Sequence, residues 1–239
     1  MSRVLVQLSG GIDSTVCLAI AIKRYGKNNV STISFDYGQS NIKELEAVKR
    51  IVSYYNVSNT IMKIDNIFFD TNCSLIKNNR KSIPKISYEE QVKRQGNLKT
   101  STNVPFRNGV MLSICTSYAL AKNYNLIYLG IHEEEGVAKD LYPDCGEKFY
   151  VAMNDTIYYG TDKKVKIDAP LLKRKKWEII KIGQKLDVPF ELTWTCYEKG
   201  NIPCGRCCAC VDRINGFRKS GIVDSIQYEG GVNNEKMFN

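Results

Sequence analysis

The chain has 239 residues, and its 34 Lys and Arg residues against 25 Asp and Glu residues give a formal net charge of +9. Hydrophobic residues make up 43% and charged residues 25% of the sequence. These proportions are close to the globular average and exclude a collagen-like chain, a wholly disordered chain and a small disulfide-rich protein. The length suffices for one sizeable core. The basic charge alone is compatible with a nucleic acid or with an anionic small substrate.

The first apolar run, Val4 to Leu8, is too short for a targeting or membrane segment. A signal peptide needs roughly 7–15 apolar residues and a membrane span needs roughly 20. We therefore expect a cytoplasmic protein with no membrane partner. In that reducing compartment, cysteines are expected as thiols or metal ligands rather than as disulfides.

Apolar runs and helical patterns alternate along much of the chain. In chain order, the predicted elements are a strand over 4–8, a helix over 14–25, strands over 30–36 and 61–64 with a helix over 43–55 between them, a helix over 108–121, a strand over 126–130 and a helix over 175–186. This alternation predicts an α/β fold with a doubly wound parallel sheet. The polar stretch 70–103, which lacks periodicity, is predicted to be a mobile loop or lid.

The junction between the first strand and the first helix reads SGGIDST, from Ser9 to Thr15. Its backbone amides and the positive end of the helix dipole converge on one point, which favours an anion. The glycine pair lets the backbone approach an oxyanion closely, and the loop hydroxyls add donors. Asp13 would repel a phosphate unless it caps the helix or holds a divalent cation, so Mg²⁺ is expected. The alternative is an ordinary strand-to-helix turn with a polar cap.

Four cysteines follow the pattern C-x7-C-x2-C-x2-C, a spacing that favours a tetrahedral metal site; they are Cys196, Cys204, Cys207 and Cys210. One structural zinc ion is the first interpretation, and an iron–sulfur cluster is the competitor. Cys208, between the ligands, is expected to point away as a spectator thiol. The chain is thus divided into a main domain over 1–190, a four-cysteine zinc-binding segment over 191–220 and a tail over 221–239, expected to be only partly ordered.

The loop at residues 9–15 resembles the SGGxDS pyrophosphate loop of the ATP pyrophosphatases. That family cleaves ATP between the α and β phosphates and transfers AMP to a substrate oxygen, in a Rossmann-like fold. Over nearly its whole length the chain also resembles the 7-cyano-7-deazaguanine synthases. The matching segments are LSGGIDSTVCL over 8–18, FDYGQ over 35–39, VPFRN over 104–108, YPDC over 142–145 and ELTWTCY over 191–197.

This resemblance implies a two-stage reaction for queuosine or another deazaguanine modification. ATP adenylates the carboxylate of 7-carboxy-7-deazaguanine, and ammonia displaces AMP to give the amide. A second ATP then activates the amide oxygen, and loss of AMP leaves the nitrile. A homodimer is expected, and no stable nucleic-acid binding.

The resemblance also assigns residues. The implied catalytic residues are Asp13, Ser14, Arg107 and Lys176. The implied ATP-binding residues are Leu8, Ser9, Gly10, Gly11, Asp13, Ser14, Thr15, Phe35 and Tyr37. The implied substrate-binding residues are Gln39, Arg107, Asn108, Tyr142 and Asp144. On spacing alone, Lys176 is equally well explained as a solvated charge in a basic run.

Three other functions stay open at this point. The same adenylation could end at a deazaguanine amide or join a deazaguanine acid to a macromolecule. A tRNA sulfur transferase shares the phosphate loop, and a non-enzymatic nucleotide sensor is the third possibility. Residues 131–140 depart from the family pattern, and His132, the single histidine, is interpreted as local structure.

Overall fold

The computed structural model describes residues 2–69, 71–77, 81–95, 100–132 and 141–229. Its centre is a five-stranded, fully parallel sheet with the strand order β3-β2-β1-β4-β5. The strands are β1 (Val4–Gln7), β2 (Val30–Asp36), β3 (Ser58–Lys63), β4 (Leu126–Tyr128) and β5 (Lys166–Asp168). The predicted doubly wound α/β architecture is confirmed.

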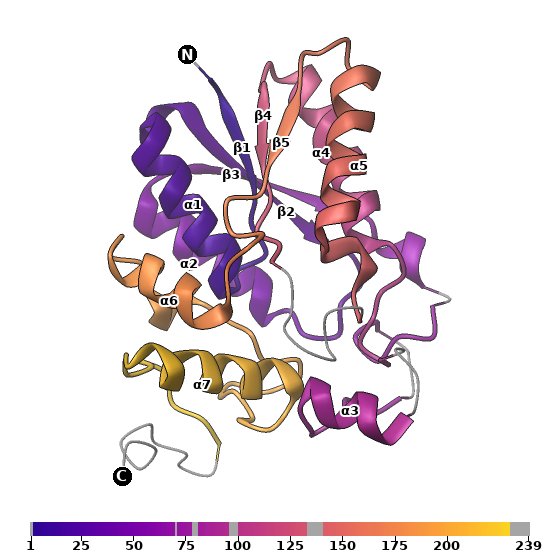
Figure 1. Cartoon of the computed structure of the whole chain (residues 1–239), viewed down its shortest axis with the longest axis vertical. Helices are drawn as coiled ribbons and strands as arrows, with labels where there is room; N and C mark the ends of the chain where they lie inside the picture. The colour runs from indigo at the N-terminus through magenta and orange to yellow at the C-terminus, as the bar shows by residue number, and fades with distance from the viewer. Residues whose placement is uncertain (1, 70, 78–80, 96–99, 133–140, 230–239) are drawn as a thin grey trace.

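Helices cover both faces of the sheet (Figure 1). The helices are α1 (Ile12–Tyr25), α2 (Lys43–Tyr55), α3 (Tyr88–Gln95), α4 (Arg107–Ala121), α5 (Glu147–Gly160), α6 (Lys176–Gln184) and α7 (Cys208–Ser220). Successive residues of β1 face opposite sides. Val4 and Val6 pack in the cluster formed with α1, α2, α6 and α7, whereas Leu5 packs in the cluster formed with α4 and α5. This alternation follows from the period of two along a strand.

The strand order reverses between β1 and β4, which are neighbours in the sheet although the whole chain from α1 to α4 lies between them in sequence. In an open parallel sheet, a crevice forms at the carboxyl ends of the strands at such a point. The segment that follows β1 is the SGGIDST loop, so the fold sets this loop in the crevice.

The stretch predicted to be a loop or lid contains helix α3. Its first turn carries Glu89 and Glu90, and its last turn carries Lys93 and Arg94, charges that complement the helix dipole. The Glu90 backbone N–H donates to Ser87 Oγ at 3.2 Å, and Arg94 pairs with Glu90 one turn earlier. This helix is stabilised by a capping side chain and by the order of its charges. It lacks a repeating apolar pattern, which is why its sequence signal is weak. Residues 78–80 and 96–99 of the stretch lie outside the described residues.

Three further elements were not predicted: α5, β5 and α7. Helix α7 begins inside the cysteine run, with Cys207 as its N-cap residue. Residues 221–229 pack on α7 through Asp224 and Tyr228, which are both buried. Residues 230–239, the rest of the predicted tail, lie outside the described part of the chain.

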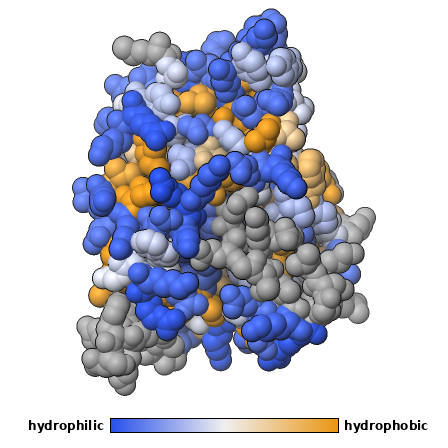
Figure 2. All heavy atoms as spheres, in the orientation of Figure 1, coloured by the Kyte–Doolittle hydropathy of each residue, from blue (hydrophilic) through white to orange (hydrophobic). Residues whose placement is uncertain are grey.

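Within the described residues, no helix combines the length and apolar character that crossing a membrane requires. The molecular face in Figure 2 is largely hydrophilic, and its apolar residues are spread over separate areas.

Candidate active site and metal centre

Two glycines fix the shape of the phosphate loop. Gly10 has φ +87°, and a Cβ there would lie 2.5 Å from the backbone oxygen of Glu44 on α2. A Cβ on Gly130, just after β4, would lie 2.8 Å from Cα of Ser14. The Gly10 carbonyl also accepts a hydrogen bond of 2.9 Å from the backbone N–H of Trp194. Neighbouring elements therefore hold the loop, and only glycine fits where they approach it most closely.

The loop hydroxyls differ in their surroundings. Ser9 Oγ and Ser14 Oγ lie 3.0 Å apart, and both residues line a cavity of about 260 Å³ above the loop. Thr15 is fully buried, and its hydroxyl donates to the Gly11 carbonyl at 2.7 Å. Ser14 Oγ also donates to the Gly11 carbonyl, at 3.1 Å, but unlike Thr15 the Ser14 side chain lines the cavity, as does Ser9.

Lys176, the first residue of α6, reaches the phosphate loop. Its Nζ donates to both carboxylate oxygens of Asp13, at 2.8 and 3.0 Å, and lies 3.2 Å from Asp212 Oδ2 on α7. The backbone N–H of Lys175 donates to the Glu178 carboxylate at 2.9 Å, which is the carboxylate half of a capping box at the start of α6. The interpretation of Lys176 as a solvated charge is therefore wrong in this structure, since its side chain is only 14% exposed.

His132 stands on the other side of Asp13. Its Nε2 is 3.7 Å from Asp13 Oδ2, and its side chain is buried. Burial of Asp13 acts to raise the pKa of this carboxyl, but the charges of Lys176 and His132 outweigh it and hold the pKa below its ordinary value. Asp13 is thus ionised near neutral pH. No partner of His132 was evident in the sequence, because the contact joins segments that are distant in the chain.

Another part of the cavity lining is formed around Arg107, the first residue of α4. Arg107 Nη1 donates to the Tyr37 hydroxyl at 3.2 Å, and the guanidinium lies 5.5 Å from the centre of the Tyr37 ring. Glu44 lines the same cavity. Burial raises the pKa of the Glu44 carboxyl to about 7, although Arg107 opposes the shift. A carboxyl that titrates near neutral pH inside a cavity is suited to accept and return protons.

Three tyrosines close the cavity between α3 and the cysteine segment. The hydroxyls of Tyr88 and Tyr197 lie 3.2 Å apart, and the Tyr142 hydroxyl lies 2.8 Å from Thr102 Oγ1. Burial raises the pKa of all three phenols above the ordinary value, so they stay neutral. They can therefore donate hydrogen bonds and offer flat ring surfaces to a planar ligand.

Nine of the residues assigned from the sequence line this one cavity: Ser9, Gly11, Asp13, Ser14, Tyr37, Arg107, Asn108, Tyr142 and Lys176. Six others are absent from its lining: Leu8, Gly10, Thr15, Phe35, Gln39 and Asp144. Gln39 accepts from the Tyr37 backbone N–H at 2.8 Å and donates to the Phe35 carbonyl. Asp144 Oδ2 accepts from the Asn108 backbone N–H at 2.8 Å, in the first turn of α4. These two side chains support the walls of the cavity.

Several lining residues were missed by sequence reasoning: Gln7, Glu44, Tyr88, His132, Thr195, Tyr197 and Asp212. Gln7 Oε1 and Thr195 Oγ1 are buried without a hydrogen-bond partner among the described residues. Buried polar atoms in this state are costly, and a bound ligand is one way to satisfy them. The position of Gln7 at the carboxyl end of β1 was the available signal.

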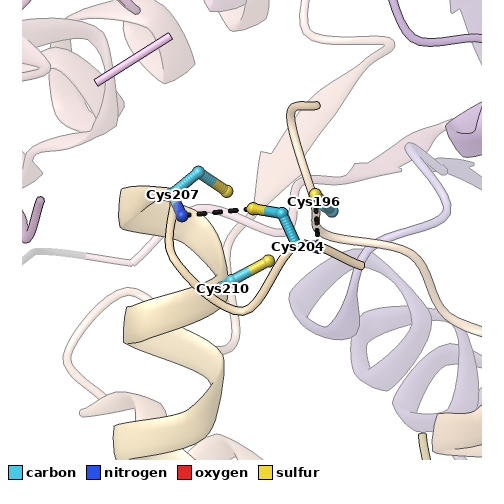
Figure 3. Close-up of side chains that lie close together, drawn as sticks. All are labelled: Cys196, Cys204, Cys207 and Cys210. Atoms are coloured by element: carbon cyan, nitrogen blue, oxygen red, sulfur yellow. Dashed lines mark hydrogen bonds between the residues drawn. The ribbon is translucent and has the colours of Figure 1, made fainter. Parts of the chain in front are cut away.

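The cysteine loop forms the second site, beside the phosphate-loop cavity. The four Sγ atoms of Cys196, Cys204, Cys207 and Cys210 lie within 4.8 Å of one another, and all four residues are buried (Figure 3). Thiolates around one tetrahedral zinc ion lie about 3.8 Å apart, given Zn–S bonds of about 2.3 Å. The donor set therefore fits a thiophilic metal ion.

Backbone N–H groups support these sulfurs. The Cys207 N–H donates to Cys204 Sγ and the Cys204 N–H to Cys196 Sγ, both at 3.3 Å (Figure 3). Such bonds favour thiolates and are the outer-shell contacts expected of a sulfur-ligated metal. Cys208 is not in the cluster; it is buried at the start of α7, as expected for a spectator thiol.

The family model described as "Queuosine biosynthesis protein QueC" matches residues 3–221. The chain belongs to this family. A 7-cyano-7-deazaguanine synthase of Caldicellulosiruptor saccharolyticus is 39% identical over 227 residues, which cover 95% of this chain and 96% of the relative. A 7-cyano-7-deazaguanine synthase of Picrophilus torridus is 37% identical, covering 96% of this chain and 92% of the relative. The QueC family thus accounts for almost the whole chain.

One solved structure with a distant resemblance to this QueC-family chain is a synthetase. An NH3-dependent NAD synthetase of Campylobacter jejuni is 20% identical with a TM-score of 0.45, covering 80% of this chain and 67% of that chain. A likeness of this size carries no argument about function.

Proposed function

We propose that the chain is an ATP-dependent synthase that converts 7-carboxy-7-deazaguanine and ammonia into 7-cyano-7-deazaguanine. The observation that carries the proposal is the single cavity in which the phosphate loop, Lys176 and Arg107 converge. Full-length similarity to 7-cyano-7-deazaguanine synthases supports the substrate assignment.

The reaction needs two adenylyl transfers because carboxylate and amide oxygens are poor leaving groups. In the first, a carboxylate oxygen attacks the α phosphorus and pyrophosphate leaves; ammonia then displaces AMP to form the amide. In the second, the amide oxygen attacks another ATP, and loss of AMP and protons from the nitrogen leaves the nitrile. Most of the catalysis in such transfers is positioning and charge neutralisation.

The phosphate loop and Lys176 are assigned to the departing pyrophosphate. Ser9, Gly11 and Ser14 line the cavity, and the backbone amides at the start of α1 with the Ser9 hydroxyl are assigned as donors to the phosphates. Lys176 adds a cation beside the same loop. Arg107 is assigned to the carboxylate of the acid, since a guanidinium can bind a carboxylate through two parallel hydrogen bonds. Tyr37, next to Arg107, is assigned to ATP, and Asn108 and Tyr142 to the deazaguanine.

Glu44 is assigned to proton transfer. Ammonia must be neutral to attack, and nitrile formation removes two protons from the amide nitrogen. A carboxyl whose pKa lies at about 7 can accept these protons near neutral pH. Asp13 is a weaker candidate because Lys176 keeps its pKa below the ordinary range.

Two metals complete the proposal. Asp13 and the loop oxygens are hard donors of the kind that Mg²⁺ prefers, and Mg²⁺ would neutralise phosphate charge when bound. The four thiols favour one structural zinc ion, because four protein ligands leave no open position for a substrate. We further propose that the protein is a cytoplasmic homodimer. In this proposal the main domain spans residues 1–190, the zinc-binding segment 191–220 is held against it, and the tail 221–239 follows.

The test incubates the pure protein with ATP, Mg²⁺, ammonium and 7-carboxy-7-deazaguanine, and follows products by mass spectrometry. The proposal expects the nitrile, with two AMP formed for each nitrile. Arrest at the amide would replace the proposal by an amide synthetase, and AMP release only in the presence of tRNA would replace it by a tRNA-modifying activity. ADP in place of AMP would contradict adenylation itself.

A further inference from the structure

The cysteine segment contributes a helix to the ATP site. Helix α7 starts at the metal loop, with Cys207 as its N-cap and Cys210 in its first turn. Helices α6 and α7 run side by side in Figure 1, and the contacts between them involve Lys176. Lys176, which lies beside the phosphate loop, is therefore in contact with α7, the helix that starts at the metal site.

Gly216 provides room for the stem of Lys176. A Cβ on Gly216 would lie 2.5 Å from Cγ of Lys176 and 2.9 Å from Cδ1 of Ile180 on α6. Contacts this short do not occur between real side chains, and Cγ lies near the root of the lysine rather than at its mobile end. A methyl group on α7 would therefore displace the whole Lys176 side chain.

Asp212 holds the other end of the same side chain. Its Oδ2 is 3.2 Å from Lys176 Nζ, which also contacts Asp13 at 2.8 Å. Asp212 and Gly216 are four residues apart on a helix, and such residues lie on the same face. One face of α7 thus accommodates the lysine stem and directs its ammonium group.

A buried network fixes α7 itself. Arg213 is 1% exposed and donates to both oxygens of Asp224, at 2.7 and 2.8 Å. It also donates to Thr193 Oγ1 at 2.8 Å and to the Phe190 carbonyl at 3.1 Å. The cysteine loop holds the start of the helix and Arg213 anchors its middle, so Asp212 and Gly216 have a rigid support.

We propose that Asp212 and Gly216 are positioning residues that hold Lys176 against the phosphate loop, so that the metal-bound segment sets the geometry for ATP. This inference rests on the proposed function for the assignment of Lys176 to the phosphates and for the identity of the acid. Lys176 is the cation assigned to the phosphates, and its placement depends on α7. The metal centre then acts on the ATP site through α7.

Gly216→Ala is the principal test because it changes no charge. Gly160→Ala is its matched control, since a Cβ at Gly160, at the end of α5, meets nothing within 4 Å. The zinc-loaded variants are compared in acid-dependent exchange of pyrophosphate into ATP and in calorimetric titration with MgATP. For Gly216→Ala we expect kcat of exchange to fall about tenfold and MgATP affinity to fall severalfold, with the KM for the acid and the zinc content unchanged.

Asp212→Asn is the second variant, with Asp155→Asn on the exposed surface of α5 as its control. Removing a negative charge beside an anion site would, on electrostatics alone, tighten MgATP binding. If Asp212 positions Lys176, Asp212→Asn instead lowers kcat about tenfold without raising the KM for ATP. Asp212→Glu then restores part of the lost kcat. A purely structural role would lower melting temperature or zinc content and leave this kcat-against-KM pattern unchanged.

The inference is overturned if Gly216→Ala and Asp212→Asn retain zinc and stay within about twofold of their controls in exchange and in MgATP affinity. If Gly216→Ala does not fold, Asp212→Asn decides alone. Should the wild type bind MgATP but make no nitrile, the proposed function fails, and the calorimetric comparison of Gly216→Ala with Gly160→Ala still tests the role of α7.

Discussion

The phosphate loop and the cysteine loop each lead into a helix, α1 and α7, but different forces hold them in place. Backbone packing fixes the phosphate loop, as the close approach of Glu44 to Gly10 shows. The cysteine loop instead brings four thiols together without regular secondary structure between residues 193 and 207. The packing of the chain itself thus shapes the phosphate loop, whereas we expect the cysteine loop to depend on the proposed metal.

This difference predicts that damage to the two loops will have different consequences. Changes in the phosphate loop should remove activity and leave the fold intact. Changes in the cysteine loop should remove both, because Trp194, next to the cysteine loop, donates to Gly10 and α7 contacts Lys176.

The largest effect is expected for Cys204→Ser, which removes one metal ligand. We expect loss of bound zinc, a drop in unfolding free energy on the order of 5 kcal/mol or more, and loss of activity. Cys208→Ser is the matched control, since Cys208 is equally buried but lies outside the thiol cluster. Metal analysis and urea unfolding of both variants check this. A Cys204→Ser protein that kept its full zinc content would show that the thiol of Cys204 is not needed to bind the metal.

The next effect tests the phosphate loop. Asp13→Asn keeps the shape of the side chain and removes its charge beside Lys176. We expect turnover to fall about 10²- to 10³-fold, with melting temperature and zinc content close to those of the wild type. Steady-state assays and thermal melts measure the two properties separately. If Asp13→Asn were as destabilised as Cys204→Ser, the contrast between the two loops would be false.

The smallest expected effect concerns Glu44, whose backbone braces the phosphate loop. Its pKa is raised to about 7 in the folded protein, from an ordinary value of 4.5, because it is buried. The folded state therefore holds a proton that the unfolded state has lost, and stability falls as pH rises from about 4.5 through 7. The total loss of unfolding free energy levels off above pH 7 at about 3 kcal/mol.

Glu44→Gln should abolish this pH dependence. The variant should be more stable than the wild type at pH 8 and no more stable at pH 4, while its turnover near neutral pH falls because the proposed proton acceptor is gone. Urea unfolding at both pH values gives the comparison. Parallel pH profiles for variant and wild type would show that Glu44 does not titrate in this range.

The two loops also differ in how much of them the sequence could predict. The phosphate loop is contiguous, and its glycines, hydroxyls and position after a strand are local signals. The cysteine spacing likewise predicts a thiol cluster. Helix α7 was missed because its start overlaps the cysteine run, and α3 was missed because charges rather than an apolar period mark it.

Local sequence patterns could not predict which side chains meet at Asp13. His132, Lys176 and Asp212 approach this carboxylate or its partner from three separate segments. Each residue alone has an ordinary explanation in the sequence, and only the order of strands and helices brings them together. Glu44 shows the same limit, because its raised pKa results from burial in the folded chain, an effect that Arg107 opposes.

The most direct test of the account labels both carboxylate oxygens of 7-carboxy-7-deazaguanine with oxygen-18 and analyses the nucleotide products. If the phosphate loop holds pyrophosphate while an adenylyl group passes first to the acid and then to the amide, each of the two AMP molecules carries one labelled oxygen. Labelled orthophosphate, or AMP without label, would contradict the account.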